Sequence, residues 1–382
     1  MAGLTPIERS LLAVIGAMTA VAGFADYQRW APVPRFAVAT VALAGLAWVV
    51  SFATEQLGER FGPGVTGMMQ STLGNLPELF VVIFALQKGE LVVAQTAIVG
   101  SIFANALLVL GLVIVVGARR APDGIMRFSK RLPRDTATLL QVTVFIIVLL
   151  GLSLASHDPA SHHVKAISAV GAVCLLTVYL AWVVPYLRSD EAPGAERDRR
   201  PAGDAAAATA PAGTLPAAAA TSEDAVAPGP RLSLGVTAGL LLVAGTASAF
   251  VSDWFVNALS PAIIQLHISQ AFAGLVIVAI AGNAVENTAG LVLAWKGRSD
   301  LAISVVKNSV AQIAAFLFPL LVLVSFALAT NLTFALAPVY IGALALTALV
   351  LWQVTGDGEA AEFEGWALVA VYVILGTLTL YE

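Results

Sequence analysis

GNLPE, residues 74–78, places a carboxylate behind a glycine, an asparagine and a proline inside an otherwise apolar segment. The same spacing returns as GNAVE at residues 282–286, and adding 208 to a position in the first copy gives its counterpart without a gap. The matched pairs are Gly74 and Gly282, Asn75 and Asn283, Glu78 and Glu286, Lys88 and Lys296, Gly89 and Gly297, and Ser101 and Ser309. An ionisable residue within a membrane segment costs about 2.5–3.5 kcal/mol on insertion scales. Two acids repeated in register at that cost indicate a functional pair.

The composition around these motifs is that of a membrane protein. Of the 382 residues, 59% are hydrophobic and only 12% are charged, whereas soluble domains carry about 25% charged residues. A bilayer core about 30 Å thick needs roughly 20 apolar residues at 1.5 Å per residue. This length test predicts eleven spans, at residues 10–25, 36–54, 64–87, 90–117, 136–155, 164–187, 232–252, 269–295, 300–329, 331–354 and 363–381. The fourth and ninth are long enough that we expect them to tilt or break.

A change in composition divides the chain into two halves. Residues 188–231 are rich in Ala, Pro and Gly and contain scattered charges, so they predict a disordered cytoplasmic linker. We expect an extra N-terminal helix in residues 1–35, a first repeat of five helices in 36–187 and a second in 232–382. The two acids are in the third and the eighth predicted spans, which differ by five, an odd number, so the repeats cross the membrane in opposite directions. The predicted fold class is all-α and polytopic, with two inverted five-helix repeats.

The distribution of basic residues predicts the orientation. With the N-terminus in the cytoplasm, fifteen of the 20 Lys and Arg residues fall in inner segments and only four in outer loops. This bias favours a cytoplasmic N-terminus and an external C-terminus. The inner loop at 355–362 is an exception, because it is acidic and contains no basic residue. We interpret the chain as a multi-pass protein of a bacterial plasma membrane.

The residues around each acid predict a cation site made of oxygen atoms. Pro77 removes a backbone donor and Gly74 weakens the helix, so carbonyls before Glu78 are expected to lose their partners. Gly282 and Gly290 flank Glu286 and permit a similar break. Hard cations such as Ca²⁺ take six to eight oxygens from carboxylates, carbonyls and amides. The alternative is that each glutamate is a protein-facing residue satisfied by its neighbours.

A second polar pattern follows each acid. Ser101 and Asn105 interrupt one apolar run four residues apart, and Ser309 and Gln312 interrupt another three apart, so each pair shares a helix face. Ser101 lies eleven residues after Glu90, roughly 16 Å along a helix and near the midplane. The candidate cation ligands are Glu78, Glu286, Asn75, Asn283, Ser101, Ser309, Asn105 and Gln312. Small polar residues also pack membrane helices together, and this alternative stays open for each of them.

Together these motifs resemble the two signature repeats of the cation/proton exchanger (CAX) family of the Ca²⁺:cation antiporter superfamily. The resemblance rests on ATEQL at 53–57, GNLPEL, AQTAIVGSIFANALLVLG, FAGLVIVAIAGNAVEN and SVAQIAAFLFPLLVL, and covers about residues 53–111 and 267–323. It implies a sodium/calcium-exchanger-like fold, with Glu78 and Glu286 as the cation and proton sites and Glu55 at the cytoplasmic mouth. On the sequence alone, Glu55 is a solvated charge at a helix end.

The chain departs from the family pattern at three positions. Asn287 stands where the family usually has histidine, and Asn308 precedes Ser309 where the family has glycine. Lys307 lies about seven residues into a predicted span and needs a partner there. If its ammonium reached a glutamate, it would act as a tethered cation and weaken divalent binding. The alternative is that it extends toward the cytoplasm or faces a helix contact. Glu55, Asn287, Lys307 and Asn308 are therefore expected modulators.

These observations lead us to expect a secondary antiporter that exchanges cytoplasmic Ca²⁺ for external H⁺ by alternating access. Ca²⁺ and H⁺ are cargo, the bilayer is the partner, and we expect no cofactor and no nucleic acid. The oligomeric state stays open, with a homo-oligomer compatible with the sequence. The alternatives are a Na⁺/Ca²⁺ or monovalent cation/H⁺ exchanger, a channel, and an intramembrane enzyme. An enzyme would need a nucleophile with its base, whereas the four histidines fall in predicted outer loops and Cys174 is the only cysteine.

Overall fold

The computed structural model describes residues 4–58, 60, 73–129, 131–188 and 231–382, and it is almost entirely helical. The first half contains α1 (Pro6–Tyr27), α2 (Pro32–Gly58), α4 (Leu76–Gln87), α5 (Leu91–Phe103), the π-helical η1 (Ala104–Val109), α6 (Leu110–Arg120), α7 (Arg131–Ala155), the short 3-10 helix η2 (Pro159–His163) and α8 (Val164–Arg188). The second half contains α9 (Leu234–Leu266), α10 (Gln270–Phe272), the π-helical η4 (Ala273–Val278), α11 (Ala279–Gly282), α12 (Ala284–Trp295), α13 (Ser299–Gln312), the π-helical η5 (Ile313–Leu317), α14 (Phe318–Ser325), α15 (Pro338–Thr355) and α16 (Glu362–Leu380).

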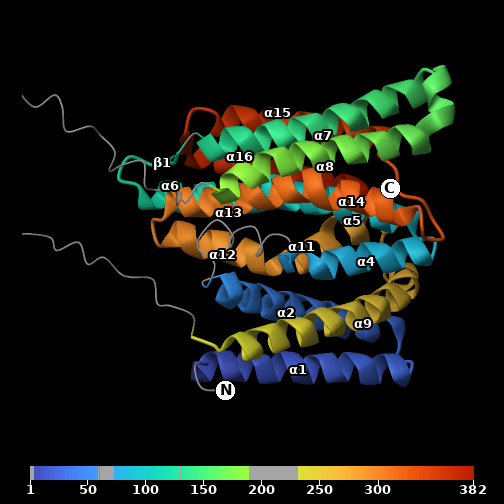
Figure 1. The fold of residues 1–382 in the computed structure, drawn as a ribbon, viewed down its shortest axis with the longest axis vertical. Helices are drawn as coiled ribbons and strands as arrows, with labels where there is room; N and C mark the ends of the chain where they lie inside the picture. Colours follow the sequence, from blue (N-terminus) through green and yellow to red (C-terminus); the bar gives the residue numbers. More distant parts are fainter. Residues whose placement is uncertain (1–3, 59, 61–72, 130, 189–230) are drawn as a thin grey trace, which may run out of the picture.

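The two halves of the chain interleave in space (Figure 1). α9, from the second half, lies against α1 and α2 from the first, and α7 packs against α15. The elements that carry the two GN motifs, α4, α11 and α12, lie between these outer groups. The N- and C-termini are at opposite ends of the bundle (Figure 1), as an odd number of crossings requires.

The predicted spans agree with the helices in most places. Within the described ranges, nine helices are long and apolar enough to cross a membrane, and Gln270–Gly282 with Asn287–Trp295 form a further span bent by 57°. Residues 61–72, which belong to the third predicted span, and most of the predicted linker lie outside the described residues. The number eleven is therefore not tested in full.

Two predicted boundaries were wrong. The span predicted to end at residue 252 continues as α9 to Leu266, because the charge of Asp253 is paired with Lys88 and does not end the helix. The span predicted at 331–354 begins only at Pro338. Before it the chain is extended and buried at Leu332, whose N–H is satisfied by the Ser325 hydroxyl at 2.8 Å.

The GN motifs interrupt their helices in the same way. Asn75 ends one helical segment with φ −85° and ψ 7°, and Pro77 lies in the first turn of the next, α4. Asn283 does the same with φ −102° and ψ 12° before α12, where no proline is present. The predicted breaks are therefore confirmed in both copies. Gly290 is not part of the second break, since it lies within α12, close enough to Val306 that an added Cβ would be 2.9 Å from that side chain.

The π-helical segments also repeat. Shifting η1 (Ala104–Val109) by 208 residues gives residues 312–317. This range contains the whole of η5 (Ile313–Leu317) and one residue before it. The two long spans that were expected to tilt or break, residues 90–117 and 300–329, are those that contain these segments. A π turn inside an α-helix is uncommon and is often found at a functional site.

A two-stranded antiparallel ribbon explains the acidic inner loop. Strand β1 (Ile125–Arg127) pairs with β2 (Glu359–Ala361), and Met126 lies opposite Ala360. Arg127 contacts Glu359 at 3.4 Å, and Arg119 contacts Glu362 at 2.7 Å. Arg127 also donates to Asp123 and so lowers the pKa of that carboxyl. The predicted inner loops 118–135 and 355–362 thus lie at one end of the bundle, where the basic loop supplies the charge that the acidic loop lacks.

Close backbone contacts hold the bundle together at glycines. A Cβ added at Gly111 on α6 would lie 2.6 Å from the carbonyl oxygen of Gly365 on α16, and the reverse contact is equally short. Small residues at such crossings let two membrane helices approach closely enough for dense van der Waals packing.

We predict that Gly111→Ala destabilises the protein by about 1–3 kcal/mol, because the added methyl forces α6 and α16 apart. Thermal unfolding in detergent measures the effect. Gly342→Ala is the matched control, since Gly342 is also helical and has no atom within 4 Å of an added Cβ. Equal melting temperatures for the two variants would show that the α6–α16 contact is not tightly packed.

Candidate cation site

The two GN motifs lie beside each other at the centre of the bundle. Gly282, at the end of α11, faces Glu78 on α4, and a Cβ added at this glycine would lie 3.8 Å from the Cβ of Glu78. A larger side chain at Gly282 would fill the space next to the carboxylate. The repeat therefore brings together two motifs that are 208 residues apart in the chain.

Each glutamate occupies the third position of a helix that begins at the break. Glu78 follows Leu76 and Pro77 in α4, and its residue is only 2% exposed. Glu286 is likewise the third residue of α12. At this position the structure describes the backbone. The N-terminal end of a helix carries a partial positive charge and free N–H groups, both of which favour a carboxylate. Paired half-helix ends of this kind are a feature of transporter sites.

Asn283 connects the second motif to the helix that follows the first. Its side-chain N–H groups donate to Ser101 Oγ at 2.9 Å and to the Ala279 carbonyl at 2.9 Å. Asn105, one turn after Ser101, donates to the Ser101 carbonyl at 3.0 Å. Ser101, Asn105 and Asn283 are all at most 1% exposed. The structure thus brings three of the predicted ligand residues into one hydrogen-bonded group.

This region contains more buried oxygen atoms than hydrogen-bond donors. Among the described residues no donor reaches four side-chain oxygens of the predicted ligands, namely Asn105 Oδ1, Asn283 Oδ1, Ser309 Oγ and Gln312 Oε1. Buried polar atoms are nearly always paired, and an unpaired one costs about 1–3 kcal/mol. Asn75, the remaining predicted amide ligand, is 5% exposed and immediately precedes α4. A group of oxygens without donors is suited to hold a cation.

Lys307 is fully buried on α13, and its Nζ donates to Thr355 Oγ1 at 2.6 Å. Thr355 is the last residue of α15, where the negative end of the helix favours an ammonium group. Of the two predicted alternatives for Lys307, the contact with a neighbouring helix is therefore observed. The adjacent Asn308 and the family-divergent Asn287 are half-buried, and the structure shows no donor for either Oδ1 among its described residues.

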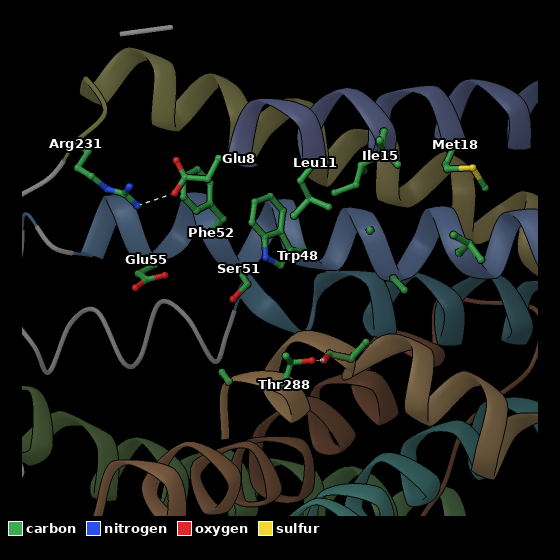
Figure 2. Close-up of a pocket in the computed structure, with 16 residues that line it drawn as sticks. Glu8, Leu11, Ile15, Met18, Trp48, Ser51, Phe52, Glu55, Arg231 and Thr288 are labelled. Carbon is green, nitrogen blue, oxygen red and sulfur yellow. Dashed lines mark hydrogen bonds and ion pairs between the residues drawn. The ribbon is translucent and has the colours of Figure 1, made fainter. Parts of the chain in front are cut away.

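A cavity of about 620 Å³ lies between α1, α2 and α12 (Figure 2). Its walls include Ile15, Met18 and Trp48, and α12 contributes Ala284, Thr288 and Ala289 just before and after Glu286. Glu55, which is exposed, and the ion pair between Arg231 and Glu8 at 2.9 Å lie at its charged end. Glu55, which is predicted to lie at the cytoplasmic mouth, thus lines one end of this cavity.

Two serines of α9 next to the site were missed by the sequence analysis. Ser252 is fully buried and donates to the Pro77 carbonyl at 3.4 Å, beside Glu78. Ser248, one turn earlier, is also fully buried. Gly245 packs against Leu76, whereas no atom approaches an added Cβ at Gly235 or Gly239. The four-residue spacing of Ser248 and Ser252 was the available signal, since it places both on one helix face.

Among the described residues there is no group of three or more His, Cys, Asp or Glu side chains that would hold a metal.

The sodium/calcium exchanger protein family model matches residues 32–186 and 236–381 of the chain. A Ca(2+)/H(+) antiporter of Aphanothece halophytica is 27% identical over 91% of this chain and 90% of its own, and one of Synechocystis is 29% identical over 92% of each. The structure of native YfkE superposes with a TM-score of 0.75 at 23% identity, covering 97% of this chain and all of its own. The resemblance drawn from the sequence motifs is confirmed at the family level, and the predicted fold class is confirmed.

We predict that Ser101→Ala weakens equilibrium binding of divalent cations by about tenfold, because the loss of a supporting hydrogen bond typically costs ten- to 100-fold in metal affinity. The hydroxyl that holds the Asn283 amide would be lost. Binding of radiolabelled Ca²⁺ to the detergent-solubilised protein measures the change. Thr377→Ala is the control, since its hydroxyl bonds only within its own helix on the exposed side of α16. An unchanged affinity in Ser101→Ala would remove this serine from the site.

Proposed function

Because the chain belongs to the sodium/calcium exchanger protein family, we propose that it exchanges cytoplasmic Ca²⁺ for external H⁺ across the membrane. Membership of this family makes it a membrane transporter rather than an enzyme. The observation that carries the choice of cargo is that several predicted ligands hold a buried side-chain oxygen that lacks a donor among the described residues. Carboxylate, amide and hydroxyl oxygens are the ligands that Ca²⁺ uses, and a carboxylate is also a proton acceptor.

Glu78 and Glu286 are the proposed carriers of charge. Burial in an apolar site favours the protonated acid, whereas a bound divalent cation favours the carboxylate. Ca²⁺ and H⁺ therefore compete for the same oxygens, and each weakens binding of the other by the same factor. Two glutamates neutralise either one Ca²⁺ or two protons. The loaded forms are then neutral at the centre, whereas the empty form keeps two charges in a medium where an isolated charge is costly.

The neutral ligands are proposed to complete the coordination shell. Asn283 is hydrogen-bonded to Ser101, and Ser101 to Asn105. Ser309, the repeat counterpart of Ser101, and Gln312 are the proposed ligands on α13. Asn75 stands in the same relation to Glu78 as Asn283 does to Glu286. The cavity at the Glu55 end is the proposed entry for cytoplasmic Ca²⁺, in agreement with a cytoplasmic N-terminus at the same end of the bundle.

A Na⁺/Ca²⁺ or monovalent cation/H⁺ exchanger is the alternative, which Lys307 suggested. A lysine that neutralised one glutamate would leave charge for a single monovalent cation. Lys307 contacts Thr355 at the end of α15. We retain Ca²⁺ as the proposed cargo because the chain is similar to Ca(2+)/H(+) antiporters over about nine-tenths of its length. Uptake of Na⁺ measured beside uptake of Ca²⁺, in wild type and in Lys307→Val, discriminates between the two exchangers.

We predict that Glu78→Gln and Glu286→Gln each reduce pH-driven Ca²⁺ uptake into proteoliposomes by more than about 100-fold. The amide can neither take up a proton nor supply the charge that holds the cation. Glu359→Gln is the matched control, because Glu359 is exposed on the ribbon strand β2 and, among the described residues, forms its ion pair with Arg127 on β1. Flux that does not depend on the pH gradient and survives in both variants would contradict the antiporter and favour a channel.

The pH dependence of binding gives a second prediction. Since acid protonates the glutamates and only the carboxylates bind Ca²⁺, affinity is highest at neutral to alkaline pH and falls as pH decreases. Where both glutamates are protonated, the apparent dissociation constant should rise about 100-fold per pH unit, because two protons leave for each Ca²⁺ bound. Equilibrium binding of radiolabelled Ca²⁺ over a pH series measures the slope. A tenfold rise per unit would mean that only one proton exchanges at the site.

A further inference from the structure

The turn that follows each GN helix has the same backbone in both copies. KGE at residues 88–90 follows α4, and KGR at residues 296–298 follows α12 after the shift of 208. The central glycines have similar positive φ angles, 81° at Gly89 and 74° at Gly297. The third residue of each turn donates its N–H to a carbonyl five residues earlier, at 2.9 Å in the first copy and 3.0 Å in the second. The two turns therefore differ in their side chains and not in their backbone.

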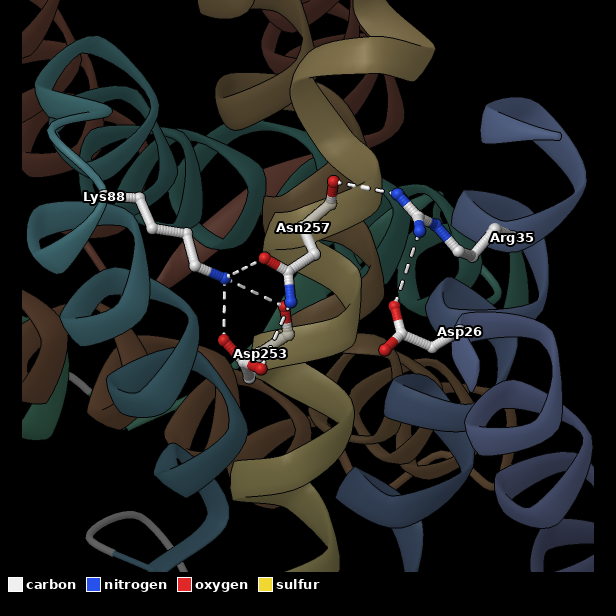
Figure 3. A network of polar contacts seen from close by, with 5 residues as sticks. All are labelled: Asp26, Arg35, Lys88, Asp253 and Asn257. Atoms are coloured by element: carbon white, nitrogen blue, oxygen red, sulfur yellow. Dashed lines mark hydrogen bonds and ion pairs between the residues drawn. The ribbon is translucent and has the colours of Figure 1, made fainter. Parts of the chain in front are cut away.

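In the first copy, the charged side chains of the turn find partners within the protein. Lys88 donates from Nζ to Asp253 Oδ1 at 2.7 Å, as Figure 3 shows. The Glu90 carboxylate accepts from the Ser260 hydroxyl and, at 3.0 Å, from Gln270 Nε2. Both charges are thus held by α9 and α10.

In the second copy, the turn presents its charges to the surface. Lys296 and Arg298 are exposed, and neither side chain forms a hydrogen bond or ion pair within the described part of the chain. Arg298 replaces the acid Glu90 and is the N-cap of α13, where the positive end of the helix disfavours a cation. Trp295, which replaces Gln87 just before the turn, is 64% exposed. The second turn is therefore basic and aromatic where the first is polar and internally paired.

Arg120, the last residue of α6, adds a third cation to this surface. Its guanidinium lies over the indole of Trp295, 5.1 Å from the ring centroid, and α6 packs against α12. The counterpart of Arg120 under the shift of 208 is Leu328, so this cation is not repeated at the other end of the bundle. We call Arg120, Trp295, Lys296 and Arg298 the basic turn patch.

The acids around the basic turn patch are engaged elsewhere. Four of them, on the adjoining ribbon and in the first turn of α13, have partners of their own among the described residues: Asp123 and Glu359 contact Arg127, Glu362 contacts Arg119, and Asp300 accepts from the Ser129 N–H at 2.6 Å. The patch has three cations and contains no acid. Its charge is therefore complementary to an anion from outside the protein.

The patch lies at the level where the membrane helices end. Trp295 is the last residue of α12, and α12 and α6 both end at the side of the bundle where the N-terminus lies (Figure 1). Tryptophan is enriched at the membrane–water interface, where its ring meets the lipid headgroups. Val292, one turn earlier on α12, is 44% exposed. Cations beside an exposed indole and an apolar helix face match a phospholipid, which has a phosphate next to its acyl chains.

We propose that the basic turn patch binds the phosphate of an anionic phospholipid in the leaflet at this end of the bundle. Arg120 and Arg298 donate to the phosphate oxygens in the forked geometry of a guanidinium, and Lys296 adds a point charge. Trp295 and the exposed side of α12 contact the first carbons of the acyl chains. The lipid thereby holds the C-terminal end of the helix that carries Glu286. This binding does not depend on which ion the protein carries.

Titration of the delipidated full chain in a neutral detergent tests the charge of the site. With dioctanoyl phosphatidylglycerol as the probe, calorimetry should show saturable binding. Lys296→Gln with Arg298→Gln should raise the dissociation constant about 25-fold, since each cation near an anionic headgroup contributes about fivefold. Lys165→Gln with Arg29→Gln is the matched control and should leave it unchanged, because these cations are exposed in the predicted outer loops. Equal affinities of the two double variants would overturn the proposal.

Two further probes distinguish a lipid from other sources of phosphate. Dioctanoyl phosphatidylcholine has the phosphate but no net charge, and inorganic phosphate has the charge but no acyl chain. Both should bind at least about tenfold more weakly than phosphatidylglycerol, because each lacks one of the two features that the patch recognises. If inorganic phosphate binds as tightly, the site is one for a soluble anion, and if phosphatidylcholine does, the cations are not the recognition element. Either result contradicts the proposal.

Quenching of tryptophan fluorescence locates the bound lipid. Phosphatidylglycerol that is brominated near the start of its acyl chains should quench the wild type in a saturable manner, and Trp295→Phe should remove that component. Trp352→Phe is the control, because Trp352 is 52% exposed on a different helix, α15. Saturable quenching that survives in Trp295→Phe would place the lipid elsewhere and reject the patch. Neither measurement needs a transported ion, so a negative result is separate from the Glu78→Gln transport assay.

Discussion

The burial of a carboxylate among apolar helices constrains the rest of this structure. Glu78 is 2% exposed, and a charge at such a position is tolerated only with compensation from helix ends, hydrogen bonds or a bound ion. The break at Asn75 supplies a helix N-terminus, and the close approach of Gly282 leaves room beside the side chain. The glycine, asparagine and proline of the motif each serve this one requirement. The second copy achieves the same break without proline, so the glycine and asparagine are sufficient for it.

Duplication places equivalent residues in inequivalent surroundings. Asn283 of the second half is bonded to Ser101 of the first half, whereas no described residue bonds the hydroxyl of the counterpart, Ser309. At the periphery, Lys88 is bound on three oxygens of α9, whereas Lys296 is exposed. A symmetric sequence therefore folds into an asymmetric state.

Much of this was predictable because membrane helices obey simple rules. Span length, the shift of 208 and the opposite direction of the two copies follow from apolar run lengths and parity, and the breaks follow from Gly74, Pro77 and Gly282. The continuation of α9 beyond residue 252 was not predictable, since Asp253 has the signature of a helix end and its partner Lys88 is 165 residues away. The Thr355 partner of Lys307 and the role of Ser252 depend on contacts between helices in the same way. Local periodicity identifies which residues are unusual, whereas the packing of distant helices determines what they contact.

The unpaired oxygens at the centre link ion binding to conformational change. Asn105, Asn283, Ser309 and Gln312 each hold a buried oxygen that no described residue satisfies, and each such atom costs about 1–3 kcal/mol. A cation or a proton on the neighbouring carboxylate recovers part of that free energy. The empty site is consequently the least stable form of the centre, and it is also the form in which the glutamates keep their charge. Movement of the helices in that form would carry the uncompensated charges through the apolar core. For the proposed function, proton–cation coupling would then follow from the energetics of these buried oxygens and carboxylates.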